Sequence, residues 1–349
     1  MAMLIPALTA LLALIFAIAL FDQWLERRGT YQLVWAFGML FYGIAAGAEA
    51  IAQASGWNEL LYRTWFLVGG IWVVGFLGLG TAFLLGKTRF GYAFALCIFL
   101  AGLFTFLTPR RNPTEYADAG SLPVLYFVIA LAFAIGIAVE TYFQNERWPR
   151  IAAVAVIGIS AVGLGLMLTT PLPAPGFSVA PGSNVPDPTL FPSSLRLLTP
   201  FSNVTGAFAL ILGALFSTYV FMPKRRVLEY SLEPGQKGDS FLFNLIIAPI
   251  AITVNFIASI PGALRALLTG KLHSRVPAVL LIAIGAFVPT VTDSLYRFGS
   301  PTLYEMGHLV GVVLIFMGFL VSIEVFREIR IPFTGRVLRG ARHEPSATP

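Results

Sequence analysis

Nine runs of apolar residues, each long enough to cross a lipid bilayer, follow one another along this chain. A hydrocarbon core of roughly 30 Å is crossed by about 20 apolar residues in a helix. Because a membrane interior cannot hydrogen-bond an open backbone, such runs fold as helices. We therefore predict an all-α fold, a polytopic transmembrane helical bundle that forms a single transmembrane domain over residues 1–330. The runs lie near residues 4–21, 32–54, 64–86, 90–108, 122–143, 150–170, 204–222, 276–298 and 303–326.

Composition agrees with an integral, multi-pass protein of the cytoplasmic (plasma) membrane, since 57% of the residues are hydrophobic and only 11% are charged. The first run has no Lys or Arg before it and no cleavage pattern of small residues after it, so we expect it to stay as a helix. Membrane lipids are then its main surroundings. The only cysteine, Cys97, allows no disulfide framework.

A tenth apolar stretch, residues 240–269, is harder to interpret. Pro249 and Pro261 break it, and Asn244 and Asn255 interrupt its apolar character. It fits a helix lying in the inner interface, which we favour, or a re-entrant segment, which would need protein or water around its open backbone. A full tenth span is the third alternative.

Loop charge separates these alternatives through the excess of Lys and Arg on the cytoplasmic side of membrane proteins. If 240–269 does not cross, the N-terminus is outside, the C-terminus is inside, and 18 of the 23 Lys and Arg residues lie inside. If it crosses, 11 of the Lys and Arg residues lie inside and 12 lie outside. The first arrangement is strongly favoured. Residues 331–349 then form a basic inner tail whose arginines meet anionic lipid, so we expect no nucleic-acid partner.

Two long polar connections lie on the predicted outer side. Residues 108–121 form the first, and residues 171–202, with eight prolines, form the second. A loop of that length either covers an opening or serves as a flexible connector. We favour the connector.

Several membrane chemistries require residues that this chain lacks. No Lys lies within a predicted span, which excludes a retinal Schiff base, and His308 is the only His within one, which excludes paired axial haem ligands. The chain contains no G-x-S-x-G, H-E-x-x-H or Walker-type motif. We therefore predict no catalytic residue and no cofactor.

Most of the few ionisable groups within or beside the spans lie toward one predicted face, and Glu140 alone lies at the inner end of the run 122–143. Counting 1.5 Å per helical residue places Glu49, Asp293 and His308 at about the same depth. Charged groups inside a bilayer usually face a bundle interior or water and often mark a site. We therefore define a candidate outer polar vestibule, comprising Glu49, Arg63, Asp293, Arg297, Glu305 and His308.

Simple anchoring is the competing interpretation of the same residues, and it is slightly favoured. In that case Glu49 pairs with Arg63, and Asp293 pairs with Arg297 at the i, i+4 spacing. All of these side chains are close enough to the surface to reach it.

Glu305 and His308 also form an E-x-x-H pair, half of the motif that builds di-metal sites in helix bundles. No second E-x-x-H follows, so we predict no metal, with Glu305, His308 and Asp293, joined by Glu49, as the weak candidate set.

These features favour a non-enzymatic protein, either a subunit of a membrane complex or an outward-facing, receptor-like binding protein. A secondary transporter of a small or lipophilic solute is the first alternative. An ion-coupled transporter usually has a charged or polar site near the bilayer midplane, whereas the midplane of these spans is apolar. A metal-dependent intramembrane enzyme using Glu305 and His308 is the second. We expect a partner subunit or a homo-oligomer as the protein partner.

Overall fold

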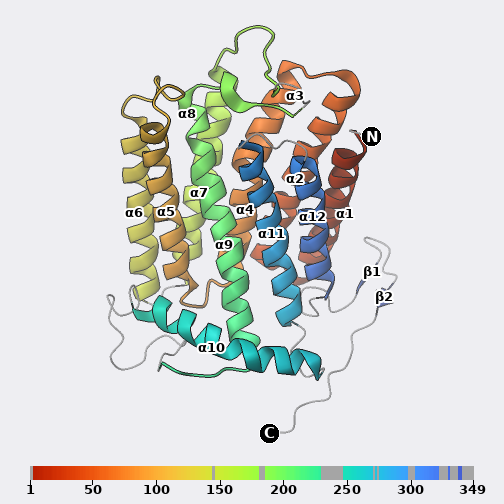
Figure 1. The fold of residues 1–349 in the computed structure, drawn as a ribbon, viewed down its shortest axis with the longest axis vertical. Coiled ribbons are helices and arrows are strands. Elements are labelled where there is room, and N and C mark those ends of the chain that lie inside the picture. Colours follow the sequence, from red (N-terminus) through yellow and green to blue (C-terminus); the bar gives the residue numbers. More distant parts are fainter. Residues whose placement is uncertain are drawn as a thin grey trace.

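In the computed structural model the helices form an elongated bundle with one helix lying across its lower end (Figure 1). The structure describes residues 3–143, 146–180, 185–228, 247–269, 272, 275–297, 303–321, 329–330 and 337–339. Within these ranges, ten helices are long and apolar enough to span a membrane. The prediction of a helical, multi-pass membrane protein is therefore confirmed.

The helix bounds follow the predicted runs closely. The third span is built from α3, a π-helical segment η1 and α4, and a short helix α8 leads into α9. The helices are α1 (Leu4–Arg27), α2 (Thr30–Ser55), α3 (Glu59–Thr64), η1 (Trp65–Trp72), α4 (Val73–Leu84), α5 (Phe90–Arg111), α6 (Leu122–Tyr142), α7 (Trp148–Thr169), η2 (Pro188–Leu190), α8 (Ser193–Arg196), α9 (Leu198–Phe221), α10 (Ala248–Leu268), α11 (Arg275–Arg297) and α12 (Tyr304–Val321).

The helix α9 begins six residues before its predicted start. Pro200 misled the prediction, because a proline suggests a loop, yet it lies in the first turn of α9. The first turn tolerates proline since its N–H groups have no partner within the helix.

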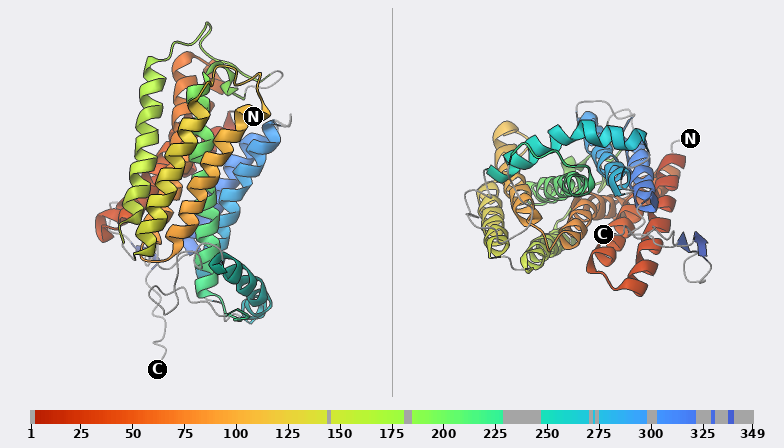
Figure 2. Two further views of the ribbon diagram at one scale, coloured as in Figure 1. Left: turned by 90° about the vertical axis from the view of Figure 1, so that its left-hand side faces the viewer. Right: turned by 90° about the horizontal axis from the view of Figure 1, so that it is seen from below.

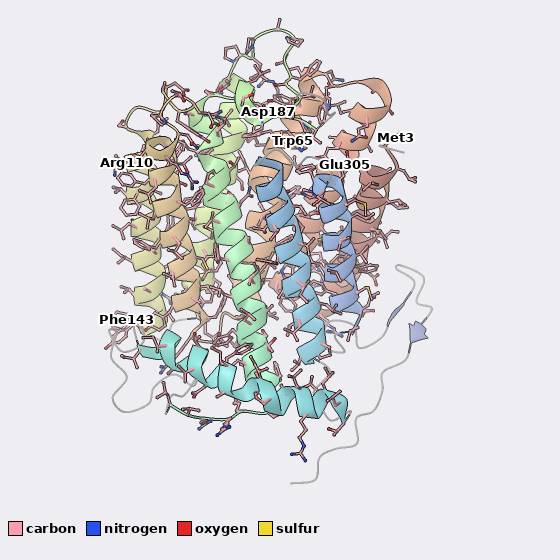
Figure 3. The ribbon with its side chains drawn as sticks, viewed as in Figure 1. Met3, Trp65, Arg110, Phe143, Asp187 and Glu305 are labelled. Atoms are coloured by element: carbon pink, nitrogen blue, oxygen red, sulfur yellow. The ribbon has the colours of Figure 1, made fainter. Side chains whose placement is uncertain are left out.

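Helix α9 is central to the bundle, where it packs against α4, α5 and α11. Three hairpins surround it, with α1 on α2, α5 on α6 and α11 on α12, while α7 packs on α6 and α4. Met3, Trp65, Arg110, Asp187 and Glu305 lie toward one end of the bundle, and Phe143 lies at the other (Figure 3). We call the first the cover end and the second the α10 end.

Close packing of α4 on α9 depends on two glycines. A Cβ atom on Gly206 would lie 2.0 Å from the Val74 carbonyl oxygen, and one on Gly78 would lie 2.5 Å from Gly206 Cα. Small residues let helix backbones in membranes approach this closely. The glycines therefore set the distance between the two helices.

Helix α10 runs crosswise beneath the bundle, as the side view and the view from below both show (Figure 2). Its polar residues fasten it to the chain that follows α9. Asn255 Oδ1 accepts hydrogen bonds from the backbone N–H groups of Val227 (2.8 Å) and Leu228 (2.9 Å), and Ser259 Oγ accepts one from Arg225 (2.8 Å). Asn255, a polar interruption of this apolar run, is thus an attachment point, whereas Asn244 lies outside the described residues.

The described part of the second long connection packs over the cover end, so the connector interpretation of this loop is wrong. Phe191 is buried and stacks on Tyr62, with ring centroids 4.7 Å apart and planes 5° apart. The Tyr62 hydroxyl donates a hydrogen bond to the Asp187 carbonyl. Aromatic packing of this kind supplies much of the apolar contact in a small cluster. Composition alone did not reveal it, because proline content is the same in an ordered cover and a loose linker.

The first long connection holds α8 in place. Asp118 accepts hydrogen bonds from the Ser193 backbone N–H (2.9 Å) and from its hydroxyl. Arg196, which is buried, donates to the Glu115 carbonyl (2.6 Å) and stacks over Tyr116.

Beyond α12, the structure describes two short segments, β1 (Ile329–Arg330) and β2 (Val337–Arg339), which pair antiparallel. The rest of the predicted basic tail, residues 331–349, lies outside the described residues.

Candidate functional site

A cavity of about 350 Å³ lies inside the bundle toward the cover end. Side chains of α2, η1, α4, α9, α11 and α12 line it, and Pro186 and Pro188 of the cover close part of its rim. Four of the predicted vestibule residues line this one cavity, namely Glu49, Asp293, Glu305 and His308. Counting helical rise placed three of them, Glu49, Asp293 and His308, at one depth, and all four line the same cavity.

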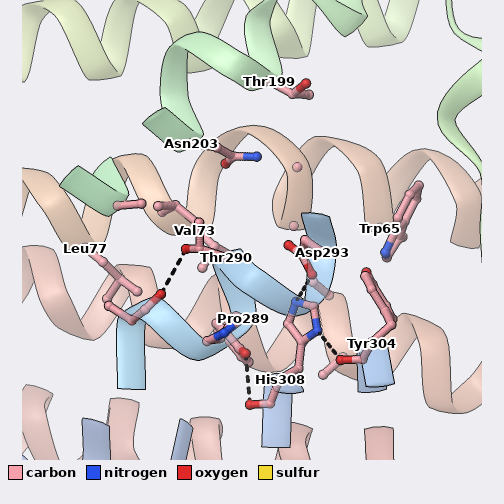
Figure 4. Close-up of a pocket in the computed structure, with 18 of the residues that line it drawn as sticks. Trp65, Val73, Leu77, Thr199, Asn203, Pro289, Thr290, Asp293, Tyr304 and His308 are labelled. Carbon is pink, nitrogen blue, oxygen red and sulfur yellow. Dashed lines mark hydrogen bonds and ion pairs between the residues drawn. The ribbon is translucent and has the colours of Figure 1, made fainter. Parts of the chain in front are cut away.

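Glu49 and Tyr304 face each other across the cavity. The Tyr304 hydroxyl donates a hydrogen bond to Glu49 Oε1 at 3.1 Å. Figure 4 shows the Trp65 ring directed toward Tyr304. A neutral donor therefore holds one oxygen of the Glu49 carboxylate in place.

His308 has a defined orientation. Its Nδ1 lies 3.0 Å from the Tyr304 carbonyl oxygen one helical turn earlier (Figure 4). Because a carbonyl only accepts, Nδ1 carries the hydrogen, and Nε2 is the nitrogen that faces Asp293 Oδ1 at 3.7 Å. That distance permits an ion pair and is too long for a hydrogen bond. The Tyr42 hydroxyl donates to the His308 carbonyl at 3.1 Å.

Glu305 has a hydrogen-bond partner of its own. Gln53 of α2 donates a hydrogen bond to Glu305 Oε1. Among the residues that the structure describes, no three His, Cys, Asp or Glu side chains converge as metal ligands. The weak candidate set of Glu305, His308 and Asp293 is thus not such a cluster among the described residues.

Arg63 is not part of the cavity lining, and its expected pairing with Glu49 is wrong. Its guanidinium forms an ion pair with Glu59 (2.6 Å) and donates hydrogen bonds to the backbone carbonyls of Met167 and Thr170. Arg63 thus ties α3 to the end of α7. Arg297 is the last residue of α11, and its side chain lies outside the described residues, so its pairing with Asp293 stays a prediction.

Below the polar groups the cavity becomes apolar. Val73 and Leu77 of α4, Leu210 of α9 and Ile315 of α12 line this deeper part. Gly69 and Gly70 of η1 also face the cavity and leave room in it. One π-helical turn re-aims the residues that follow it, and such turns often occur at functional sites.

The candidate vestibule was defined from charged groups alone, so it missed Tyr42, Trp65, Asn203 and Tyr304, which also line the cavity. Tyr42, Glu49 and Gln53 recur at spacings of seven and four, which places them on one face of α2, and Tyr304 precedes His308 by one turn. That periodicity was a usable signal. The sequence contains no comparable signal for Trp65 and Asn203, since their positions in the cavity depend on how η1 and α9 pack.

No protein family, curated protein or solved structure matches this chain. The chemistry of the site therefore has to be judged from its geometry. It offers carboxylates, an imidazole and aromatic rings at one end of a pre-formed apolar cavity, an arrangement suited to holding a small molecule.

Proposed function

We propose that this protein is a non-enzymatic, receptor-like binding protein of the plasma membrane, which holds a small molecule in the cavity below its cover. The single observation that carries the proposal is the convergence of polar groups from α2, α11 and α12 on one end of an apolar cavity. Ligand sites in proteins are concave and largely apolar, with a few polar groups that fix orientation.

The proposed orientation places the cover end outside and the α10 end inside. It is supported by the crosswise position of α10 (Figure 1), because nine of the ten candidate spans among the described residues then remain to cross the membrane. With α10 counted as interfacial, 18 of the 23 Lys and Arg residues fall inside. The cavity then faces outward.

Transport is the second candidate, and the depth of the cavity favours it. Leu77 and Ile315, which line the lower cavity, lie well along α4 and α12. Alternating access requires such a deep site between two groups of helices. A transporter would expose Leu77→Cys and Ile315→Cys in turn to reagents on both sides, whereas a binding protein would expose them from outside alone.

Native mass spectrometry after release in mild detergent tests the binding function. We expect a bound small molecule on the wild-type chain and its loss from Gly70→Leu. The three atoms nearest to a Cβ at Gly70 are Thr199 Cγ2 at 3.5 Å and two Phe66 ring carbons at 3.8 and 4.0 Å, all at ordinary contact distance, and Gly70 lines the cavity, so a larger side chain can grow into it. Gly158→Leu is the matched control, because a Cβ there meets nothing within 4 Å.

Labelling from outside gives a second measurement. In a Cys97→Ser background, Asn203→Cys should react with a membrane-impermeant thiol reagent, and Gly70→Leu should protect it. A chain that carries no small molecule and whose Asn203→Cys resists outside reagent would contradict the proposal. A stoichiometric protein partner without a small molecule would instead identify a subunit of a membrane complex.

A further inference from the structure

We propose that the ligand is an amphiphilic amine, whose ammonium group lies between Glu49 and Asp293 and whose apolar body extends toward Leu77 and Ile315. This inference rests on the proposed binding function and names its ligand class. It follows from four separate properties of the cavity.

Charge is the first property. Glu49, Asp293 and Glu305 line the cavity, and His308 is its only basic side chain among the lining residues that the structure describes. A protonated His308 could balance one carboxylate at most. The described lining is therefore acidic overall, and a cationic ligand is complementary to it in charge.

Aromatic rings are the second property. Tyr42, Trp65 and Tyr304 line the same end of the cavity as the two carboxylates. Cations bind over such ring faces, most strongly over Trp and most of all where water is excluded. An anion would meet the negative faces of these rings.

Hydrogen-bond polarity is the third property. Glu49 and Asp293 accept hydrogen bonds when they are ionised, and the amide oxygen of Asn203, on the opposite wall, has no donor among the described residues. An ammonium group has three N–H donors and no acceptor. It therefore suits this set of acceptors better than a neutral alcohol, which has one donor.

Shape and access are the fourth property. Val73, Leu77 and Leu210 make the deeper walls apolar. Phe104 and Phe208 line the cavity and are also exposed, by 49% and 45%, on the outside of the bundle. In a membrane this rim borders lipid, so a ligand with an apolar body can arrive from the bilayer.

Equilibrium dialysis with radiolabelled decylamine tests the inference on the full chain in lipid nanodiscs, with empty nanodiscs measuring partition into lipid. We expect saturable binding near one decylammonium per chain. Glu49→Gln and Asp293→Asn should each weaken binding at least tenfold, and Trp65→Leu by about fivefold. Glu140→Gln is the control, because this acid of α6 does not line the cavity.

Matched probes distinguish the possible failures. Decyl sulfate and decanol share the tail and should bind at least tenfold more weakly than decylamine. If either binds as tightly, the ligand class is wrong and the binding function stands. If decylamine binds equally to wild type, Glu49→Gln and Asp293→Asn, the assigned ammonium site is wrong. If no probe binds, the binding function fails as well. Glu49→Asp, which keeps the charge, should retain measurable binding and guards against a variant that fails to fold.

Discussion

The Tyr304 hydroxyl lies 3.1 Å from Glu49 Oε1 and so joins α12 to α2, although the two residues are 255 positions apart. A second hydrogen bond joins the same two helices, because the Tyr42 hydroxyl of α2 donates to the His308 carbonyl of α12. These paired hydrogen bonds fix the two walls of the cavity relative to each other. They therefore link the stability of the bundle to the geometry of the proposed site.

Tyr304→Phe should lower the free energy of unfolding by about 1 kcal/mol, because Glu49 loses a hydrogen-bond donor that joins α12 to α2. The decrease should appear as a lower melting temperature in detergent. Tyr142→Phe is the control, since Tyr142 is 40% exposed. Equal melting temperatures for the two variants would mean that the Tyr304–Glu49 bond contributes nothing to stability.

Gly206→Ala should destabilise the bundle by about 1–3 kcal/mol through overpacking, because the new Cβ would clash with the Val74 carbonyl. Gly165→Ala should be neutral or stabilising, since a Cβ there meets nothing within 4 Å and alanine favours a helix. Thermal unfolding of both variants measures the contrast. A stable Gly206→Ala would show that α4 and α9 can separate without cost.

Asp118→Asn should loosen α8 and the cover at neutral pH. Burial by itself would raise the pKa of Asp118, but hydrogen bonds from the side chain and backbone of Ser193, together with Arg196, lower it below its ordinary value of 3.8. Because Asp118 is exposed, we expect a loss of only about 1 kcal/mol.

The pH dependence of this loss has a definite sign. A depressed pKa in the folded state stabilises the fold fully above pH 3.8, and the effect disappears as the pH falls through the lower, folded-state pKa. The difference in melting temperature between wild type and Asp118→Asn should therefore be constant from pH 7 to about 5 and vanish in stronger acid. Glu146→Gln, which removes an exposed ion pair with Lys87, should show little difference at any pH. A wild-type advantage that grows in acid would contradict this assignment.

Spin labels on α10 should report the depth of an interfacial helix. Ile257 and Leu264 are exposed by 60% and 55% on this helix, whereas Ala251 faces the protein. Labels at the two exposed positions, in a Cys97→Ser background, should lie near the boundary between headgroups and acyl chains, at similar depths. Depth is measured by power saturation with oxygen and a nickel complex. A label at Ile257 near the bilayer midplane, with one at Leu264 much shallower, would indicate a crossing helix.

The sequence by itself determined the helical, multi-pass architecture and the approximate ends of its spans. Hydropathy and run length are local properties, and a bilayer imposes one length on every span. Helical rise also placed Glu49, Asp293 and His308 at one depth, because depth depends only on the distance from the end of a helix.

Tertiary structure decided the partners of these groups. Arg63 pairs with Glu59 and with backbone carbonyls at the end of α7, and Glu49 accepts a hydrogen bond from Tyr304. These partners could not be predicted, because the direction of a side chain around its helix depends on how neighbouring helices pack. The same packing directed Trp65 toward Tyr304 and drew the proline-rich connection over the cover end. A sequence states which groups reach a given depth, but only the packed bundle states which of them face one another.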